Sequence, residues 1–270
     1  MAGLSGKVAV VTGASRGVGK GLAQGLAEAG ATVYATGRTI AAEAFADGGD
    51  AFADAGNVTP VRCDHRNDAE VEAAFRRVVD EQARLDVLVN NVWGGYEKMV
   101  EDGRFTWPLP FWKQPLWRWD AMFEAGVRAH YVSSVYAART MIEQRSGLIV
   151  NISFWSAQKH MGNVAYGVAK AATDKMTADM AHELRDYNVA VVSLYPGLVR
   201  TESVMEAAAF FDLSNSESPR FIGRAVAGLA SDPNIMRESG RVLVAAAVAL
   251  KYGITDIDGK QPRALTLEDV

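Results

Sequence analysis

Three residues in the second half of the chain have the types and the spacing of a proton-transfer site. Tyr166 and Lys170 stand four positions apart in YGVAK, and Ser153 lies thirteen positions before Tyr166. Residues four apart on a helix share one face, so the tyrosine and the lysine can meet the same ligand. A tyrosine hydroxyl titrates at about 10, and a neighbouring ammonium lowers that pKa. The alternative is three ordinary residues on a helix and the strand before it.

A glycine-rich segment near the start of the chain has the pattern of a nucleotide-binding loop. TGASRGVG, residues 12–19, follows an apolar run and opens a stretch of helical period. Glycines allow positive φ and a close approach of the backbone to a pyrophosphate, whose charge is favoured at a helix N-terminus. A tight turn without a ligand is the alternative. The position between a predicted strand and a predicted helix favours dinucleotide binding.

The residues after the second predicted strand indicate which dinucleotide is bound. An acidic residue there favours the free ribose 2′-hydroxyl, whereas arginine accommodates a 2′-phosphate. ATVYATG, residues 31–37, contains no acidic residue, Arg38 follows it, and Arg16 lies in the glycine loop. Two guanidiniums can hold a phosphate through charge-assisted bonds, so we expect NADP(H) rather than NAD(H). The alternative is that either arginine points into solvent.

Two more polar residues follow predicted strands. Asp64 comes after the third strand, where it can accept a hydrogen bond from the adenine amino group. Asn90 comes after the fourth, where it can bridge strands and border the adenosine ribose. The alternative is that both are ordinary polar residues at strand ends, and we favour the ligand roles because of their positions in the fold.

Short apolar runs alternate with longer stretches of helical period along the chain. The predicted strands are 7–13, 31–37, 58–64, 85–91, 147–153, 189–197 and 241–247, and the predicted helices are 17–29, 39–55, 68–83, 117–144, 164–187 and 219–230. Strands that are apolar on both faces and separated by helices predict an α/β fold, a Rossmann-type doubly wound parallel sheet of about seven strands with helices on both faces. No linker or repeat divides the sequence, so we expect one domain over 1–270.

Two segments depart from this alternation. Residues 93–119 hold five of the six tryptophans together with three prolines, a composition that does not favour helix, and we expect something to cover the rings. Residues 202–220 suggest a mobile helical piece after a strand end. Because both segments follow strands whose ends should face the cofactor, we expect them to wall an apolar pocket for a hydrophobic carbonyl substrate. The alternative is that the aromatic residues pack a subunit interface or anchor the loop.

The composition argues against several classes of protein. With 270 residues and 49% hydrophobic residues the chain can bury a sizeable core, and a net charge of -4 without a basic stripe disfavours nucleic-acid binding. No signal peptide or membrane span is expected, and we expect a cytoplasmic location. Dispersed histidines give no metal site, and the single cysteine, Cys63, is expected to be a small buried residue.

Five separated motifs together resemble the classical short-chain dehydrogenase/reductase family. They are TGASRGVG, the pair of asparagines at 90–91, Ser153, Tyr166 with Lys170, and YPGLVRT at 195–201. The resemblance covers about residues 5 to 255, and NNVWGG, VRAHYVSSVYAAR, YGVAKAATDKMTADMAHELR and SDPNIMRESGRVL are most similar to one branch of the family.

The resemblance implies carbonyl–alcohol interconversion with the cofactor at the carboxyl ends of the strands. Residues implied to border the cofactor are Gly13, Ser15, Arg16, Gly17, Val18, Gly19, Arg38, Asp64, Asn90, Tyr166, Lys170, Pro196, Gly197, Val199 and Thr201. In ketone reduction Tyr166 would protonate the oxygen, Ser153 would donate to the developing charge, and Lys170 would hold the ribose and tune Tyr166. The family also implies homodimers or homotetramers joined through 117–144 and 164–187.

Two positions depart from the family pattern. The register of the strand before NISFWSA can place Phe154 at the serine position, leaving Ser153 or Ser156 to serve, and spacing favours Ser153. Seven residues after Trp119, where the family has an asparagine of the proton relay, stands Gly126. Either the missing side chain admits water or lets the helix bend, so that the relay persists, as we favour, or the relay is impaired. A non-catalytic NADP(H) sensor or scaffold on the same fold is the alternative function.

Overall fold

The computed structural model describes residues 3–40, 57–96, 99–101 and 104–270. Its main sheet has seven parallel strands in the order β3-β2-β1-β4-β7-β8-β9. The strands are β1 Val8–Val11, β2 Thr32–Gly37, β3 Val58–Arg62, β4 Val87–Asn90, β7 Gly147–Ile152, β8 Val189–Tyr195 and β9 Val242–Val244. The predicted doubly wound sheet of about seven strands is confirmed.

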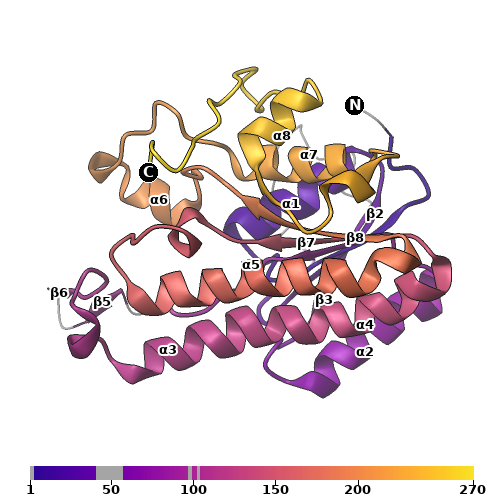
Figure 1. Ribbon diagram of the computed structural model, residues 1–270, viewed down its shortest axis with the longest axis horizontal. Coiled ribbons are helices and arrows are strands. Elements are labelled where there is room, and N and C mark those ends of the chain that lie inside the picture. The colour runs from indigo at the N-terminus through magenta and orange to yellow at the C-terminus, as the bar shows by residue number, and fades with distance from the viewer. Residues whose placement is uncertain (1–2, 41–56, 97–98, 102–103) are drawn as a thin grey trace.

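Helices cover both faces of this sheet, with α1, α7 and α8 on one side and α2, α4 and α5 on the other (Figure 1). Their bounds are α1 Gly17–Glu28, α2 Asp68–Gln82, α3 Leu116–Met122, α4 Ala129–Gln144, α5 Val164–Leu184, α6 Glu202–Glu206, α7 Pro219–Ala230 and α8 Ala245–Lys251. Short 3₁₀ turns lie at Phe111–Lys113, Trp155–Ala157, Arg185–Tyr187, Ala208–Phe210 and Ile235–Glu238.

Alternation along the strands explains why they are apolar throughout. Ala9 and Val11 of β1 belong to the core cluster under α1 and α7, whereas Val8 and Val10 belong to the cluster under α2, α4 and α5. Successive side chains of a strand point to opposite faces, and here both faces are covered.

The last predicted strand is wrong in extent. Residues 241–247 were expected to be extended, but β9 ends at Val244 and α8 begins at Ala245. The alanine run at 245–247 has high helix propensity, and β9 pairs with β8 alone, so little holds those residues in the sheet. The predicted helix over 39–55 falls mostly outside the described residues.

The aromatic segment contains more regular structure than its composition predicts. It forms a two-stranded ribbon of β5 Val100–Glu101 and β6 Arg104–Phe105, and α3 begins at Leu116. The expectation that its rings are covered is wrong in part, because the exposed fraction is 70% for Trp112 and 64% for Phe111. The segment lies at the same end of the molecule as α6 (Figure 1), and α6 confirms a helical piece within 202–220.

Candidate active site

Tyr166 and Lys170 lie on the first turns of α5, which a buried residue anchors. The side chain of Asn163 caps the helix by accepting a hydrogen bond from the Tyr166 backbone N–H at 3.0 Å, and its amide donates to the Trp107 carbonyl at 3.2 Å. Lys170 Nζ donates to the Ile152 carbonyl at the end of β7, at 3.1 Å. The cap and the strand end therefore fix both side chains at the carboxyl edge of the sheet.

Four aromatic rings surround the Tyr166 ring, and we call them the aromatic cluster. The ring centroids of Trp107, Trp93, Tyr96 and Phe154 lie 5.3, 5.5, 6.0 and 6.2 Å from that of Tyr166. Three of these residues come from the segment after β4 and the fourth from the end of β7. An apolar enclosure of this kind strengthens the electrostatic interactions made inside it.

Burial governs the titration of the two central groups. It raises the pKa of Tyr166 to about 12, although side-chain interactions with Tyr96 and Ser156 lower it. Burial also lowers the pKa of Lys170 to about 7, and the charge of Asp174 opposes that change. At neutral pH Tyr166 is therefore a protonated acid beside a lysine that titrates in the physiological range.

The structure separates the two candidate serines. The hydroxyl of Ser153 donates to the backbone carbonyl of Lys170 at 3.3 Å, while Phe154, next in the chain, faces Tyr166. Ser156 lies on the following 3₁₀ turn; its buried hydroxyl has no hydrogen bond within the described residues, yet it lowers the pKa of Tyr166. Ile152 belongs to the core cluster on the α1 and α7 side, so strand alternation places Ser153 on the α5 side, where Tyr166 also lies. Which of the two serines acts in catalysis stays a prediction.

Gly126 lies in a π-helical turn, Phe123–Arg128, that joins α3 to α4. The space beside it is filled, because a β-carbon there would stand 2.6 Å from Cζ3 of Trp93. The same indole ring lies 3.9 Å from Lys170 Nζ, measured to the ring centroid. The helix is therefore distorted as one interpretation expected, but the gap left by the missing side chain holds an indole ring.

The glycine loop has the shape of an anion cradle. Gly13 and Gly17 have φ of 66° and 55°, and a β-carbon on Gly19 would stand 2.1 Å from the Gly13 carbonyl oxygen. The Asn91 amide donates to the carbonyls of Thr12 and Gly13, both at 3.1 Å. Val18 packs against the core, so its backbone rather than its side chain borders the loop.

An acidic side chain already lies at the start of α1. The Gly17 N–H donates to the Glu202 carboxylate, at 3.0 Å to Oε2, and Thr201 caps α6 beside it. A carboxylate at this N–H shows that the helix N-terminus accepts an anion. Sequence reasoning could not single out Glu202, because only the fold brings α6 to α1.

The residues expected at the adenosine end lie close together. The Ser15 hydroxyl lies over Gly37, 2.2 Å from where a β-carbon there would project, and Arg38 is the next residue. Arg16 and Arg38 are exposed, and their guanidiniums form no hydrogen bond within the described part of the chain. Asp64 has its carboxylate paired with Arg66, which lowers its pKa, and the charge of Arg38 acts in the same direction.

Asn90 is fully buried and links two strands. Its amide donates to Asn151 of β7 at 2.8 Å and to Ser134 of α4 at 2.9 Å. The expected bridge between strands is confirmed. Its place beside the ribose stays a prediction.

The loop after β8 is hydrogen-bonded to the buried carboxyl group of Glu217. The Gly197 N–H, after Pro196, donates to Glu217 at 2.8 Å, and Val199 forms an isolated bridge with Glu217. Burial raises the pKa of Glu217 to about 7. The expected nicotinamide side of the site, which includes Thr201, is thus one connected loop.

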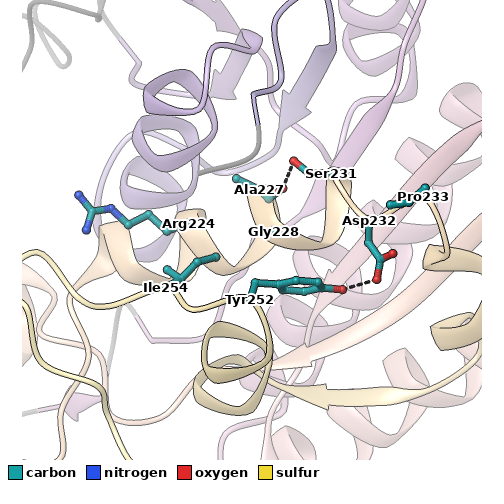
Figure 2. A pocket seen from close by; sticks show the side chains of 8 residues that line it. All are labelled: Arg224, Ala227, Gly228, Ser231, Asp232, Pro233, Tyr252 and Ile254. Atoms are coloured by element: carbon teal, nitrogen blue, oxygen red, sulfur yellow. Dashed lines mark hydrogen bonds between the residues drawn. The ribbon is translucent and has the colours of Figure 1, made fainter.

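A separate pocket of about 230 Å³ lies between α7 and the turn after α8 (Figure 2). Its polar groups bond to one another or to nearby residues, as Tyr252 does to Asp232 and Arg224 to Glu28. It contains none of the predicted site residues.

Cys63 is buried as expected, which raises the pKa of its thiol to about 12. No helix in the described ranges is long and apolar enough to cross a membrane.

Comparison with known proteins gives consistent matches. The family model described as short chain dehydrogenase matches residues 7–210. The mouse protein dehydrogenase/reductase SDR family member 1 is 45% identical, over 96% of this chain and 86% of its own length, and the human protein of that name is 42% identical over 95% and 85%. They represent the branch that the four sequence segments resemble. A solved 7α-hydroxysteroid dehydrogenase, complexed with NADH and 7-oxo glycochenodeoxycholic acid, superposes with a TM-score of 0.74 at 25% identity, over 90% of this chain and 93% of that one.

Proposed function

Because this chain belongs to the short-chain dehydrogenase family of oxidoreductases, in which carbonyl and alcohol groups are interconverted, we propose an NADP(H)-dependent enzyme that acts on a hydrophobic substrate. In this proposal Tyr166 is the general acid and base. The observation that carries it is the buried Tyr166 hydroxyl group, which shares one face of α5 with Lys170 and lies inside the aromatic cluster.

The residues of the glycine loop fit a dinucleotide. Gly19 leaves no room for a β-carbon above the loop, and the Gly17 N–H already holds a carboxylate, so the same N–H can hold a diphosphate. Lys170 and the loop from Pro196 to Thr201 would hold the nicotinamide side. When bound, the reduced nicotinamide supplies a hydride to the substrate carbonyl carbon.

The protein supplies the proton. Tyr166, protonated at neutral pH, gives its proton to the carbonyl oxygen, and Ser156 donates a hydrogen bond to the developing charge. The positive charge of Lys170, 5.7 Å from the Tyr166 ring centroid, stabilises the phenolate that results. Alcohol oxidation uses the same groups in reverse.

Preference for NADP(H) rests on the two arginines. Arg16 and Arg38 are the neighbours in sequence of Ser15 and Gly37, and the Ser15 side chain covers Gly37. No acidic residue stands at the end of β2 to favour a free 2′-hydroxyl.

A hydrophobic substrate is supported by what lines the approach to Tyr166. The aromatic cluster offers ring faces around Tyr166. Further large apolar side chains are exposed on the segments 93–119 and 202–220, among them Phe111, Trp112, Phe210 and Phe211. The similar 7α-hydroxysteroid dehydrogenase was solved in complex with 7-oxo glycochenodeoxycholic acid, a large carbonyl compound. Homodimers or homotetramers and a cytoplasmic location stay predictions.

The test is NADPH oxidation measured across a panel of aldehydes, ketones and quinones, with Tyr166→Phe as the matched variant. We expect bulky apolar carbonyl compounds to be reduced and the variant to lose at least about 100-fold in kcat. Equal activity of Tyr166→Phe refutes the assigned acid. Tight NADPH binding without turnover of any compound supports the sensor function instead.

A further inference from the structure

Lys170 has almost no direct path to solvent. Its side chain is 6% exposed, Nζ donates to the Ile152 carbonyl, and the Trp93 ring covers it at 3.9 Å. If Tyr166 is the acid, as in the proposed function on which this inference rests, each carbonyl reduction leaves a phenolate that Lys170 reprotonates. Lys170 must then regain a proton through the interior of the protein.

His130 is near enough to this covered lysine for the Lys170 charge to lower the pKa of its imidazole. It stands one helical turn after Gly126, and its Nε2 lies 3.0 Å from the carbonyl oxygen of Val92, the residue before Trp93. A carbonyl oxygen can only accept, so Nε2 carries the hydrogen and Nδ1 is an acceptor. Trp93 contacts both Gly126 and Lys170, and His130 is bonded to the residue directly before Trp93.

Two buried polar atoms of these residues have no partner within the described part of the chain. They are the acceptor His130 Nδ1 and the donor Trp93 Nε1. Buried polar groups in proteins are nearly always paired, with ordered water where protein atoms do not suffice. A water molecule could donate a hydrogen bond to His130 Nδ1 or accept one from Trp93 Nε1, so these two atoms are candidate ligands of a buried water near Lys170.

His130 is suited to hold water rather than to carry a proton. It is buried, and the groups that act on the pKa of its imidazole are the Lys170 ammonium, the Val92 carbonyl and the neutral ring of His65. Burial and the Lys170 charge lower the pKa of His130 to about 3, so the ring stays neutral. His65 differs, because Thr36 and Ser133 occupy both of its nitrogens.

We propose that His130 is a positioning residue for proton return to Lys170, and that its Nδ1 accepts a hydrogen bond from the water molecule with which Lys170 exchanges protons. In carbonyl reduction the Lys170 amine takes one proton from this water, and the hydroxide left behind takes one from solvent. The imidazole gains and loses no proton. His130 thereby supplies a further water ligand next to the helix in which Gly126 stands at the usual asparagine position.

Asp174 is the competing candidate. It lies one turn after Lys170 and its charge acts on that lysine, and its Oδ1 is also buried and unpartnered. Its other oxygen accepts from the Tyr195 hydroxyl, however, and Asp174 is only partly buried. His130, by contrast, is buried, and it is bonded to the residue directly before Trp93, whose ring covers Lys170.

The test compares His130→Leu with His130→Gln in the full chain. Glutamine can both donate to the Val92 carbonyl and accept a hydrogen bond from water, whereas leucine does neither. With a substrate from the panel, we expect His130→Leu to lower kcat by roughly 10-fold, to increase the solvent deuterium isotope effect on kcat and to alter its pH profile, with the NADPH KM unchanged. His130→Gln restores all three.

An intact, folded His130→Leu protein with wild-type kcat, isotope effect and pH profile overturns the proposal. If kcat, the isotope effect and the pH profile change only in Asp174→Asn, the role belongs to Asp174.

A measurement on the wild-type protein covers the case in which His130→Leu does not fold. In ¹⁵N-histidine NMR spectra we expect His130 to remain the neutral Nε2–H tautomer from pH 8 down to about pH 5. An Nδ1–H tautomer, or an imidazolium at pH 6, overturns the proposal. Neither result depends on turnover, whereas failure of Tyr166→Phe to lose activity refutes the proposed function itself.

Discussion

The indole ring of Trp93 occupies the space into which a side chain at position 126 would project. A β-carbon on Gly126 would stand 2.6 Å from Cζ3 of Trp93. The Lys170 ammonium lies 3.9 Å from the centroid of the same ring. The large side chain of Trp93 and the absence of a side chain at Gly126 thus depend on each other, and together they pack against Lys170.

Gly126→Ala is expected to destabilise the protein although alanine favours helix. Overpacking costs about 1–3 kcal/mol, against a gain in helix propensity of up to about 1 kcal/mol. In Trp93→Gly the space is free, so the same alanine should cost less there, with a coupling of about 1 kcal/mol in urea unfolding of the four proteins. Strict additivity would show that the ring and the glycine are independent.

Lys170 should make stability depend on pH. Its pKa is lowered to about 7 in the folded protein, from an ordinary value of 10.5. Between these values the unfolded chain binds the proton that the folded chain releases, so the free energy of unfolding rises with pH. We expect the wild type to gain stability relative to Lys170→Met from pH 7 to pH 10, measured by urea unfolding, and no such gain below pH 6. A difference that stays constant with pH would mean that Lys170 is not desolvated.

Ser156 and Ser153 should differ as catalytic groups. Because the Ser156 hydroxyl acts on Tyr166 and the Ser153 hydroxyl is bonded to the Lys170 carbonyl, Ser156→Ala should lower kcat by about 100-fold and Ser153→Ala by much less. Steady-state kinetics of the two variants, with melting temperatures as the check on folding, decide between them. The reverse order would return the role to Ser153.

Arg38→Ala should weaken NADPH binding about 10- to 100-fold and leave NADH binding almost unchanged, since only NADPH carries the 2′-phosphate. Arg16→Ala should act in the same direction. Arg76→Ala removes an exposed guanidinium from α2 and controls for net charge. Titration of both cofactors by calorimetry tests this, and equal affinities of the wild type for NADPH and NADH would rule out the preference.

Glu202→Ala should tighten cofactor binding by about two- to fivefold, because it removes a carboxylate from the Gly17 N–H that a diphosphate would use. Glu206→Ala, on the same helix and exposed, is the matched control. The effect should shrink as salt is raised. Weaker cofactor binding in Glu202→Ala would instead mean that α6 helps to hold the cofactor.

Much of the fold followed from local patterns. Apolar runs and helical period located all seven strands, although β9 is shorter than expected, and most helices, and the capped start of α5 lies where the sequence placed it. These features depend on neighbours within a few residues, which a sequence displays directly. Strand β9 was the exception, since an edge strand has few contacts to hold it and its alanines favour helix.

The sequence by itself determined the glycine loop, the spacing of Tyr166 and Lys170, and the absence of a usual side chain at Gly126. The tertiary structure alone decided that Ser156 lies near enough to Tyr166 to lower its pKa, that Trp93 fills the space at Gly126, and that Glu202 meets Gly17. The physical reason is separation along the chain. Contacts between residues tens to hundreds of positions apart depend on strand register and helix packing, which leave no periodic trace in the sequence.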